Sequence, residues 1–364
     1  MIEKIQLELT TSCNLSCEYC LRPNMISELD QEIVEKVNGM AKKFVLYGYG
    51  EPLLHDKLLD LVKLLDGELV LSTNGMVDEK FYEVADLVDL IGISLDLNDS
   101  LRRGMELNKI LRKLDNLKGK AVAEIVLTKE NFPKLSELAE KLAERSVDIM
   151  ATNLIAPNSE IYAKALYFEG SRDNADFLHV DEDFVLKMLK TRKPEQENLD
   201  IIHRNINLCA LIEAKDRIRL AKKSESEIER IEEIAKSYGV NFTKPKFFGE
   251  VKQRECPYRD SIFVRADSLV SPCMPFAYTH IEFVNRRKNI VQEFVFGSLK
   301  DEIDEIIEIK HHFETLRTRM DFPYCGDCGH TAGCWFLENG MDCYVNKPSC
   351  AQCLYSVGIA KCLI

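Results

Sequence analysis

Residues 3–20, EKIQLELTTSCNLSCEYC, are the stretch from which the fold of this chain is best inferred. Residues 3–9 alternate polar and apolar side chains well enough to predict a β-strand. Cys13, Cys17 and Cys20 follow in a loop with the spacing CxxxCxxC. Three thiolates so close together can ligate three irons of a 4Fe–4S cubane and leave the fourth iron open. Structural zinc normally takes four protein ligands, so this trio fits zinc poorly.

The pattern downstream of this loop predicts an α/β fold. Six apolar strands alternate with five amphipathic helices, which indicates a parallel sheet covered by helices. Six units are too few for a closed eight-stranded barrel, so we expect a partial (β/α)6 barrel. The predicted strands are 3–9, 43–48, 68–72, 90–96, 121–128 and 147–155, and the predicted helices are 27–39, 53–67, 78–88, 105–119 and 132–146.

Polar or glycine-rich residues come directly after several of these strands. Ligands of parallel sheets bind where the strands end at their carboxyl side, so these residues are expected to share one rim. They are Gly48, Gly50, Glu51 and Pro52 after the second strand, Asn74 after the third, Ser94 and Asp96 at the end of the fourth, and Asn153 at the end of the sixth.

Composition limits the classes of function. The chain has 364 residues, 46% of them hydrophobic, and a formal net charge of −12. The negative charge disfavours general binding to nucleic acid or anionic membranes. No apolar run of about 18 residues and no signal-peptide pattern occurs, so a cytoplasmic protein without membrane spans is expected. Thirteen cysteines in a reducing compartment indicate metal binding instead of disulfides.

The remaining cysteines suggest how the chain is divided. We expect the barrel at residues 1–180, a helical connector at 181–250 that includes a helix at 225–239, and a small cysteine-rich Fe–S domain at 251–364, which needs metal because its core is thin. Zinc bound by the CGDCGH segment with His330, or by a Cys350/Cys353 knuckle, stays an alternative for this domain. Its cysteines are Cys256, Cys273, Cys325, Cys328, Cys334, Cys343, Cys350, Cys353 and Cys362.

The cysteine loop, the GYGEP segment and the Ser94-Leu95-Asp96 segment resemble the radical S-adenosylmethionine (SAM) superfamily. The resemblance covers about residues 1–160 and implies a 4Fe–4S cluster on Cys13, Cys17 and Cys20. It also implies that the segment from Gly48 to Pro52 binds the methionine end of SAM, that Ser94 and Asp96 bind the ribose, and that Asn74 and Asn153 contact SAM. In that family, one electron from the cluster cleaves SAM to a 5′-deoxyadenosyl radical, which takes a hydrogen atom from the substrate.

The C-terminal cysteines resemble the SPASM extension of the same superfamily, which carries auxiliary 4Fe–4S clusters. The chain departs from that pattern at Ser268, where a glycine is usual, and at Glu338, where a cysteine is usual. One or two auxiliary clusters are therefore expected, with Cys256, Cys273 and Cys343 on one. The other cluster would take Cys325, Cys328 and Cys334, with closing ligands from Cys350, Cys353 and Cys362.

The terminal stretch from residue 341 to 362 resembles radical SAM maturases associated with tungsten-containing aldehyde ferredoxin oxidoreductases. The resemblance implies an electron donor such as ferredoxin, and a tungsten oxidoreductase or its pterin cofactor as partner. Two alternatives stay open: a SPASM maturase of a peptide or protein, and a non-catalytic Fe–S or zinc scaffold. Cys13 lies almost at the start, which disfavours a peptide-docking domain before the barrel. No general acid or base is assigned.

Overall fold

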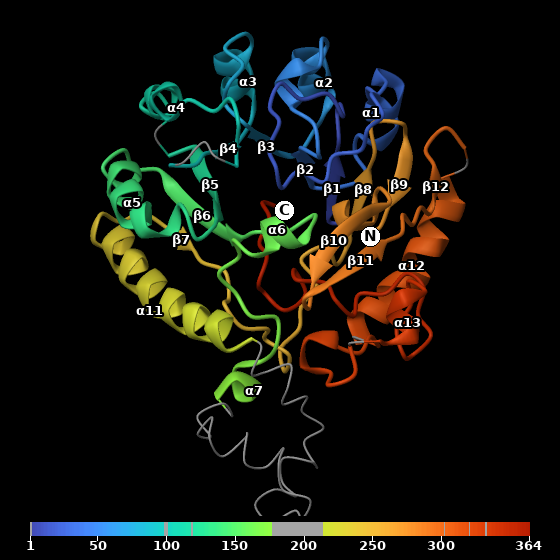
Figure 1. Ribbon diagram of the computed structural model, residues 1–364. Coiled ribbons are helices and arrows are strands. Elements are labelled where there is room, and N and C mark those ends of the chain that lie inside the picture. The colour runs from blue at the N-terminus through green and yellow to red at the C-terminus, as the bar shows by residue number, and fades with distance from the viewer. Residues whose placement is uncertain are drawn as a thin grey trace, which may run out of the picture.

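Six βα units form the first half of the computed structural model, which describes residues 2–97, 101–117, 119–176, 214–301, 303–319, 321–331 and 333–364. The helices α1 to α5 lie outside an arc of strands (Figure 1). The strands are β1 (Lys4–Leu7), β2 (Lys43–Leu46), β3 (Glu68–Thr73), β4 (Leu90–Ser94), β5 (Ala121–Leu127) and β6 (Asp148–Asn153). The helices are α1 (Gln31–Val37), α2 (Leu58–Leu64), α3 (Phe81–Leu87), α4 (Leu107–Leu114) and α5 (Leu135–Ala143).

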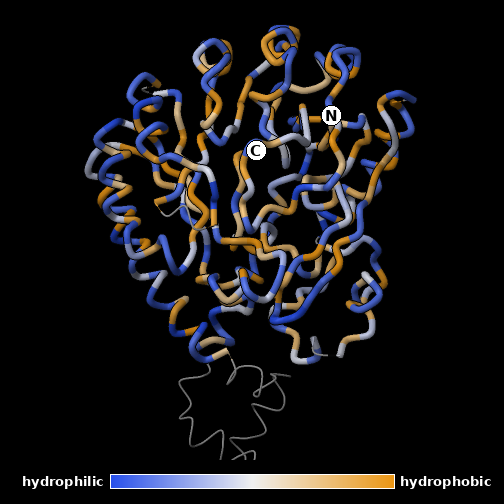
Figure 2. The backbone as a smooth tube through the Cα atoms, turned by 45° about the horizontal axis from the view of Figure 1, so that its top comes forward, coloured by the Kyte–Doolittle hydropathy of each residue, from blue (hydrophilic) through white to orange (hydrophobic). Residues whose placement is uncertain are grey.

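The strands pair in parallel in chain order from β1 to β6, and β7 (Phe242–Thr243) pairs with β6. Central strands are almost entirely buried, and each helix buries one apolar stripe; on α5 this stripe includes Leu135, Leu138 and Leu142. Figure 2 shows the resulting pattern, with hydrophobic and hydrophilic residues alternating along the outer helices. The prediction of a partial parallel barrel covered by helices is confirmed.

The sheet continues on the other side of β1 into the C-terminal part of the chain. β8 (Ser261–Val264) pairs in parallel with β1, in the register Lys4 to Ser261 and Leu7 to Val264. β9 (Leu269–Ser271) and β12 (Gly297–Ser298) follow in antiparallel pairing, so the sheet has ten strands. All four residues of β8 are buried. The sheet therefore crosses residue 250, where the sequence predicted a domain boundary.

The connector predicted at 181–250 is described only from residue 214 onward. Its predicted helix at 225–239 is part of a longer helix, α11 (Lys215–Ser237), whose buried face includes Ile218, Ile228 and Ile231. α11 packs against α5 and β7. Residues 181–213 of the predicted connector lie outside the described residues.

The C-terminal part carries the cysteine loops and ends inside the arc of strands (Figure 1). The backbone N–H of Lys361 donates to Thr152 Oγ1 at 2.8 Å. Leu363 lies so close to Gly92 that a Cβ there would come within 2.7 Å of its side chain. The elements of the C-terminal part include the hairpin β10 (His280–Val284) and β11 (Arg287–Val291), the long helix α12 (Ile303–Arg319) and the one-turn helix α13 (Trp335–Glu338). The short helices are η1 (Pro52–Leu54), η2 (Phe132–Lys134), α6 (Ser159–Tyr162), α7 (Arg172–Asp176), η4 (Met274–Phe276) and η5 (Cys325–Asp327).

None of the helices in the described ranges is both long enough and apolar enough to cross a membrane.

Candidate active site

The loop after β1 brings three cysteines to one cavity. Cys13, Cys17 and Cys20 line a cavity of about 290 Å³ at the carboxyl ends of the strands. Burial raises the pKa of the Cys17 and Cys20 thiols, because it disfavours their thiolate forms until a cation is near. Three thiols from one loop suit a 4Fe–4S cluster with one open iron. Cys362 also lines this cavity, but the charges that act on its thiol come from Lys4, Cys256 and Cys353 and not from the three cysteines of the loop. In the described ranges, no three His, Cys, Asp or Glu side chains are grouped as ligands of a single metal ion.

The GYGEP segment is fixed against this cysteine loop by close backbone contact. A Cβ on Gly50 would lie 2.0 Å from the carbonyl oxygen of Thr10, so the position admits only glycine. The N–H of Glu51 donates to the carbonyl oxygen of Ser12 at 2.7 Å. Gly48 and Gly50 line the cavity, whereas Pro52 begins the short helix η1 and lies outside the lining.

The carboxylate of Glu51 joins the second and third strand-end loops. It accepts hydrogen bonds from Thr73 Oγ1 at 2.6 Å and from the backbone N–H of Asn74 at 2.7 Å. Burial raises the pKa of Glu51, and these hydrogen bonds act in the opposite direction. Asn74 in turn donates from Nδ2 to Asn14 Oδ1 at 2.8 Å and lies 3.8 Å from Cys13 Sγ. The Glu51 carboxylate therefore holds Asn74 close to the cysteine loop.

The two residues predicted to bind ribose have different surroundings. Ser94 lines the cavity, where its hydroxyl donates to Glu124 Oε2 at 3.5 Å. Asp96 is buried but lies outside the lining, and its Oδ1 accepts a hydrogen bond from Asn131 Nδ2 at 3.0 Å. Asn131 also caps its own turn by accepting from the N–H of Thr128. In this structure Asp96 therefore braces the loop after β5.

Glu124 on β5 is a cavity residue that the sequence analysis missed. It accepts a hydrogen bond from Ser72 and lines the cavity beside Ser94. Burial raises its pKa, and the hydrogen bonds with Ser72 and Ser94 and the charge of Arg102 partly oppose that rise. The available signal was a single acid within the apolar stretch AVAEIVL.

Arg102 is a second cavity residue that was not predicted. Its Nε donates to the hydroxyl of Tyr19 at 2.9 Å, and its guanidinium lies 5.9 Å from the centre of that ring. The side chain is buried, and its charge partly opposes the rise that burial gives the pKa of the Cys17 thiol. No regular pattern surrounds residue 102, so the sequence offered no signal for it.

Asn153 connects the cavity with the C-terminal segment. Its Nδ2 donates to the carbonyl oxygens of Lys246 and Ile359 at 2.9 and 3.1 Å. Its Oδ1 is buried with no hydrogen-bond partner among the described residues. Because Asn153 lines the cavity, this oxygen is available to a donor on a bound ligand.

Eight C-terminal cysteines form two groups of four thiols. Cys256, Cys273, Cys350 and Cys353 line a second, smaller cavity of about 60 Å³. The other group is Cys325, Cys328, Cys334 and Cys343. Burial raises the pKa of Cys325 and Cys343, and the nearby Cys328 and Cys334 add to that rise. The sequence analysis placed Cys343 with Cys256 and Cys273. In the structure it lies with the CxxC pair instead, because the segment after α13 folds back toward η5.

Cys362, the ninth of these cysteines, lies in the last residues of the chain. It lines the cavity of the first three cysteines, together with Lys361 and Leu363. Burial raises its pKa to about 12, and its thiol lies near Tyr258. Neither group of four needs Cys362 to be complete.

Two regions of the chain match known domains. Residues 7–131 match the radical SAM superfamily, and residues 256–330 match the SPASM iron–sulfur cluster-binding domain. The chain is a radical SAM enzyme with an SPASM domain. The first match contains Cys13, Cys17 and Cys20, and the second begins at Cys256. Its cofactors are accordingly a 4Fe–4S cluster, SAM and SPASM-type auxiliary Fe–S clusters.

One curated relative of this radical SAM enzyme matches almost its full length, and others match part of it. It is 26% identical to the "tungsten-containing aldehyde ferredoxin oxidoreductase cofactor-modifying protein" of Pyrococcus furiosus, over 99% of this chain and 97% of that protein. A GTP 3′,8-cyclase of Chlorobaculum tepidum is 26% identical over 32% of this chain and 41% of that protein. The fold is similar to that of Streptococcus suis SuiB bound to S-adenosylmethionine, with a TM-score of 0.55 and 14% identity over 89% of this chain and 69% of that one.

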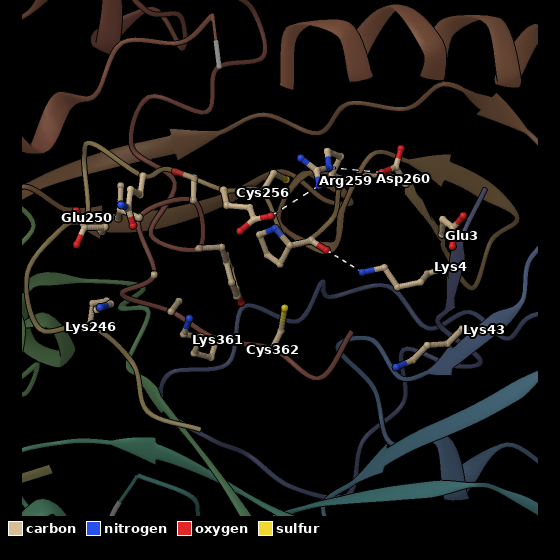
Figure 3. Close-up of a pocket in the computed structure, with 18 of the residues that line it drawn as sticks. Glu3, Lys4, Lys43, Lys246, Glu250, Cys256, Arg259, Asp260, Lys361 and Cys362 are labelled. Carbon is tan, nitrogen blue, oxygen red and sulfur yellow. Dashed lines mark hydrogen bonds and ion pairs between the residues drawn. The ribbon is translucent and has the colours of Figure 1, made fainter. Parts of the chain in front are cut away.

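A third and larger cavity opens at the amino ends of the strands of this radical SAM enzyme (Figure 3). It has a volume of about 780 Å³ and is lined by both acids and bases. The Lys4 ammonium donates to the carbonyl oxygen of Pro257 at 3.1 Å, and Lys43 pairs with Glu68 at 3.2 Å. Tyr355, Lys361 and Cys362 line both this cavity and the cavity of Cys13, Cys17 and Cys20, so they form the wall between the two.

Proposed function

We propose that this radical SAM enzyme abstracts a hydrogen atom from a substrate during maturation of a tungsten (tungstopterin) oxidoreductase. The observation that carries this proposal is the similarity to the Pyrococcus furiosus cofactor-modifying protein, which covers 99% of this chain and includes both domains. Relatives with other reactions cover less of this chain: the GTP 3′,8-cyclase of Chlorobaculum tepidum covers 32% of it, and that of Helicobacter pylori covers 75% at 25% identity.

The first cluster is assigned to Cys13, Cys17 and Cys20, and the SAM contacts to the rim residues of the same cavity. When bound, the 4Fe–4S cluster and SAM supply a 5′-deoxyadenosyl radical. The chain positions them: Gly48 and Gly50 allow close backbone approach, and Ser94 offers a hydroxyl. The residues proposed to bind SAM at this cavity are Gly48, Gly50, Glu51, Pro52, Asn74, Ser94, Asp96 and Asn153. Of these, Glu51, Pro52 and Asp96 contribute by holding loops in place.

Apolar side chains form part of the cavity wall and should limit the access of water to the reacting atoms. Leu15, Val126 and Met150 line the cavity, and Leu363 closes against Gly92 on β4. A dry, closed site protects a reactive radical from side reactions. The C-terminal segment, tied to β6 through Thr152 and Asn153, is part of that closure.

Two auxiliary 4Fe–4S clusters are proposed, one on each group of four thiols. Each group supplies the four thiolates that such a cluster needs. Within the first group, burial and the charges of nearby cysteines together raise the pKa of Cys273 to about 12 and that of Cys353 to about 11. Without metal these thiols hold their protons, and metal binding releases the protons and stabilises the thiolates.

The proposed partners follow from the chemistry. An enzyme of this family needs an electron donor, for which we propose a ferredoxin. The substrate side is a tungsten oxidoreductase or its pterin cofactor, and the reaction is placed in the cytoplasm.

The test uses anaerobically reconstituted protein with SAM and dithionite. We expect 5′-deoxyadenosine to form faster when pterin cofactor released from a tungsten oxidoreductase is added, with a mass change in that cofactor. The C13A variant serves as the control and should form none. Formation stimulated by a peptide and not by the pterin would favour the peptide-maturase alternative. No 5′-deoxyadenosine from protein with intact clusters would favour a non-catalytic scaffold.

A further inference from the structure

Arg317 on α12 lies against the first group of four thiols. Its side chain is 2% exposed, and it lines the cavity of Cys256, Cys273, Cys350 and Cys353. The guanidinium is close enough to these thiols for their negative charge to raise its pKa, although burial alone would lower it. A buried cation beside acidic ligands is stable only if its charge is balanced locally.

The hydrogen bonds of Arg317 fix it without using all its donors. Nη1 donates to the carbonyl oxygens of Tyr258 at 3.2 Å and Pro272 at 3.0 Å. These carbonyls lie next to Cys256 and Cys273 in the chain, so the arginine also holds the two cysteine loops together. Nε is buried and has no hydrogen-bond partner in the described ranges. A buried N–H without a partner is rare and indicates a missing acceptor.

The neighbouring charged side chains do not neutralise the positive charge of the Arg317 guanidinium. Glu314 Oε1 lies 3.3 Å from Arg317 Nη1 and 4.0 Å from Lys310 Nζ, so these three groups together carry one positive charge. On the other side of the cavity, Glu282 is paired with His280 at 3.1 Å. The Glu282 carboxylate raises the pKa of His280, whereas burial lowers it. The side of the thiol group that faces α12 is therefore positive.

We propose that Arg317 raises the reduction potential of an auxiliary 4Fe–4S cluster held by Cys256, Cys273, Cys350 and Cys353, with Nε–H donating to a cluster sulfur. This inference rests on the proposed cluster assignment. Reduction adds one negative charge to a cluster that already carries four thiolates. A buried cation and an N–H donor stabilise that reduced state, and hydrogen bonds and net charge are known determinants of cluster potential. Arg317 is thus a positioning residue for electron transfer and touches no substrate.

The test is an EPR-monitored redox titration of the full chain. The C13A/C17A/C20A background removes the cluster proposed on these three cysteines, so the remaining signals come from the auxiliary clusters. For R317M we expect the ratio of reduced to oxidised cluster at a fixed potential to fall at least tenfold for one auxiliary signal, which is a downward shift of 59 mV for one electron. The second auxiliary signal should not move. R319M, which removes an exposed arginine from the same helix, should move neither.

Two further variants keep the outcomes separable. R317K retains the charge and should shift the potential by less than half as much as R317M. E314Q removes the neighbouring negative charge and should raise the potential of the same signal. If R317M loses its iron, the E314Q variant becomes the test. A higher reduction potential of the auxiliary cluster in E314Q supports the inference, and an unchanged potential overturns it. Unchanged potentials in an R317M protein with full iron content also overturn it. If C350S leaves the iron content unaltered, the proposed cluster assignment has failed instead.

Discussion

Gly50 is the position where a single methyl group should separate the GYGEP segment from the cysteine loop. The Cβ of an alanine would meet Thr10 O at 2.0 Å and Ser12 O at 2.8 Å, and both neighbours are backbone atoms that cannot rotate away. Ordinary contact begins at 3.4 Å, so the two loops must move apart by about 1.4 Å. A misplacement of about 1 Å at a reacting centre costs about 100-fold in rate. For G50A we expect 5′-deoxyadenosine formation to fall by about two orders of magnitude.

The assay is single-turnover 5′-deoxyadenosine formation by reconstituted protein with dithionite, with iron content and thermal melting measured on the same samples. The matched control is G39A, where a Cβ meets nothing within 4 Å but the backbone has a φ of +78°. G39A should lose about 1 kcal/mol of stability and keep its rate. A G50A rate within a few-fold of the parent, with the protein folded, would refute the close-packing argument for this loop pair.

Three further outcomes test the site. C362S should keep the iron content of the parent, whereas C350S should lose about four iron atoms per chain by chemical iron assay; equal losses would make Cys362 a ligand. E124Q should gain stability relative to the parent as the pH rises above the ordinary carboxyl pKa of 4.5. Burial raises the pKa of Glu124 in the folded parent, so the unfolded parent ionises first and the stability of the parent falls with rising pH, whereas E124Q has no carboxyl group to ionise at this position. A melting-temperature difference that stays constant with pH would contradict this. R102M should weaken binding of the cluster on Cys13, Cys17 and Cys20, because the Arg102 guanidinium favours the Cys17 thiolate. The expected readout is slower iron uptake during reconstitution, and uptake at the parental rate would argue against that role.

The barrel could be predicted because each of its units is local. Apolar strands and amphipathic helices alternate at short spacing, and each strand end carries a polar group. The pairing of β8 with β1 joins Ser261 to Lys4, far apart in the sequence, and SIFV alone does not reveal its partner. That pairing was therefore not predicted.

Side-chain direction at the site was harder to predict than position. Ser94 ends β4 and Asp96 follows two residues later, but Ser94 lines the cavity and Asp96 accepts a hydrogen bond from Asn131 on the next loop. Glu124 looked like part of an ordinary buried strand. The grouping of Cys343 depends on how irregular loops fold back, for which no periodic signal exists.

The most direct measurement is Mössbauer spectroscopy of ⁵⁷Fe-reconstituted protein with and without SAM. If Cys13, Cys17 and Cys20 hold a cluster with one open iron, SAM should change the spectrum of one iron in that cluster, and this change should disappear in C13A, C17A and C20A. A spectrum unaffected by SAM in the parent, or a SAM-dependent change that persists in those variants, would contradict the account.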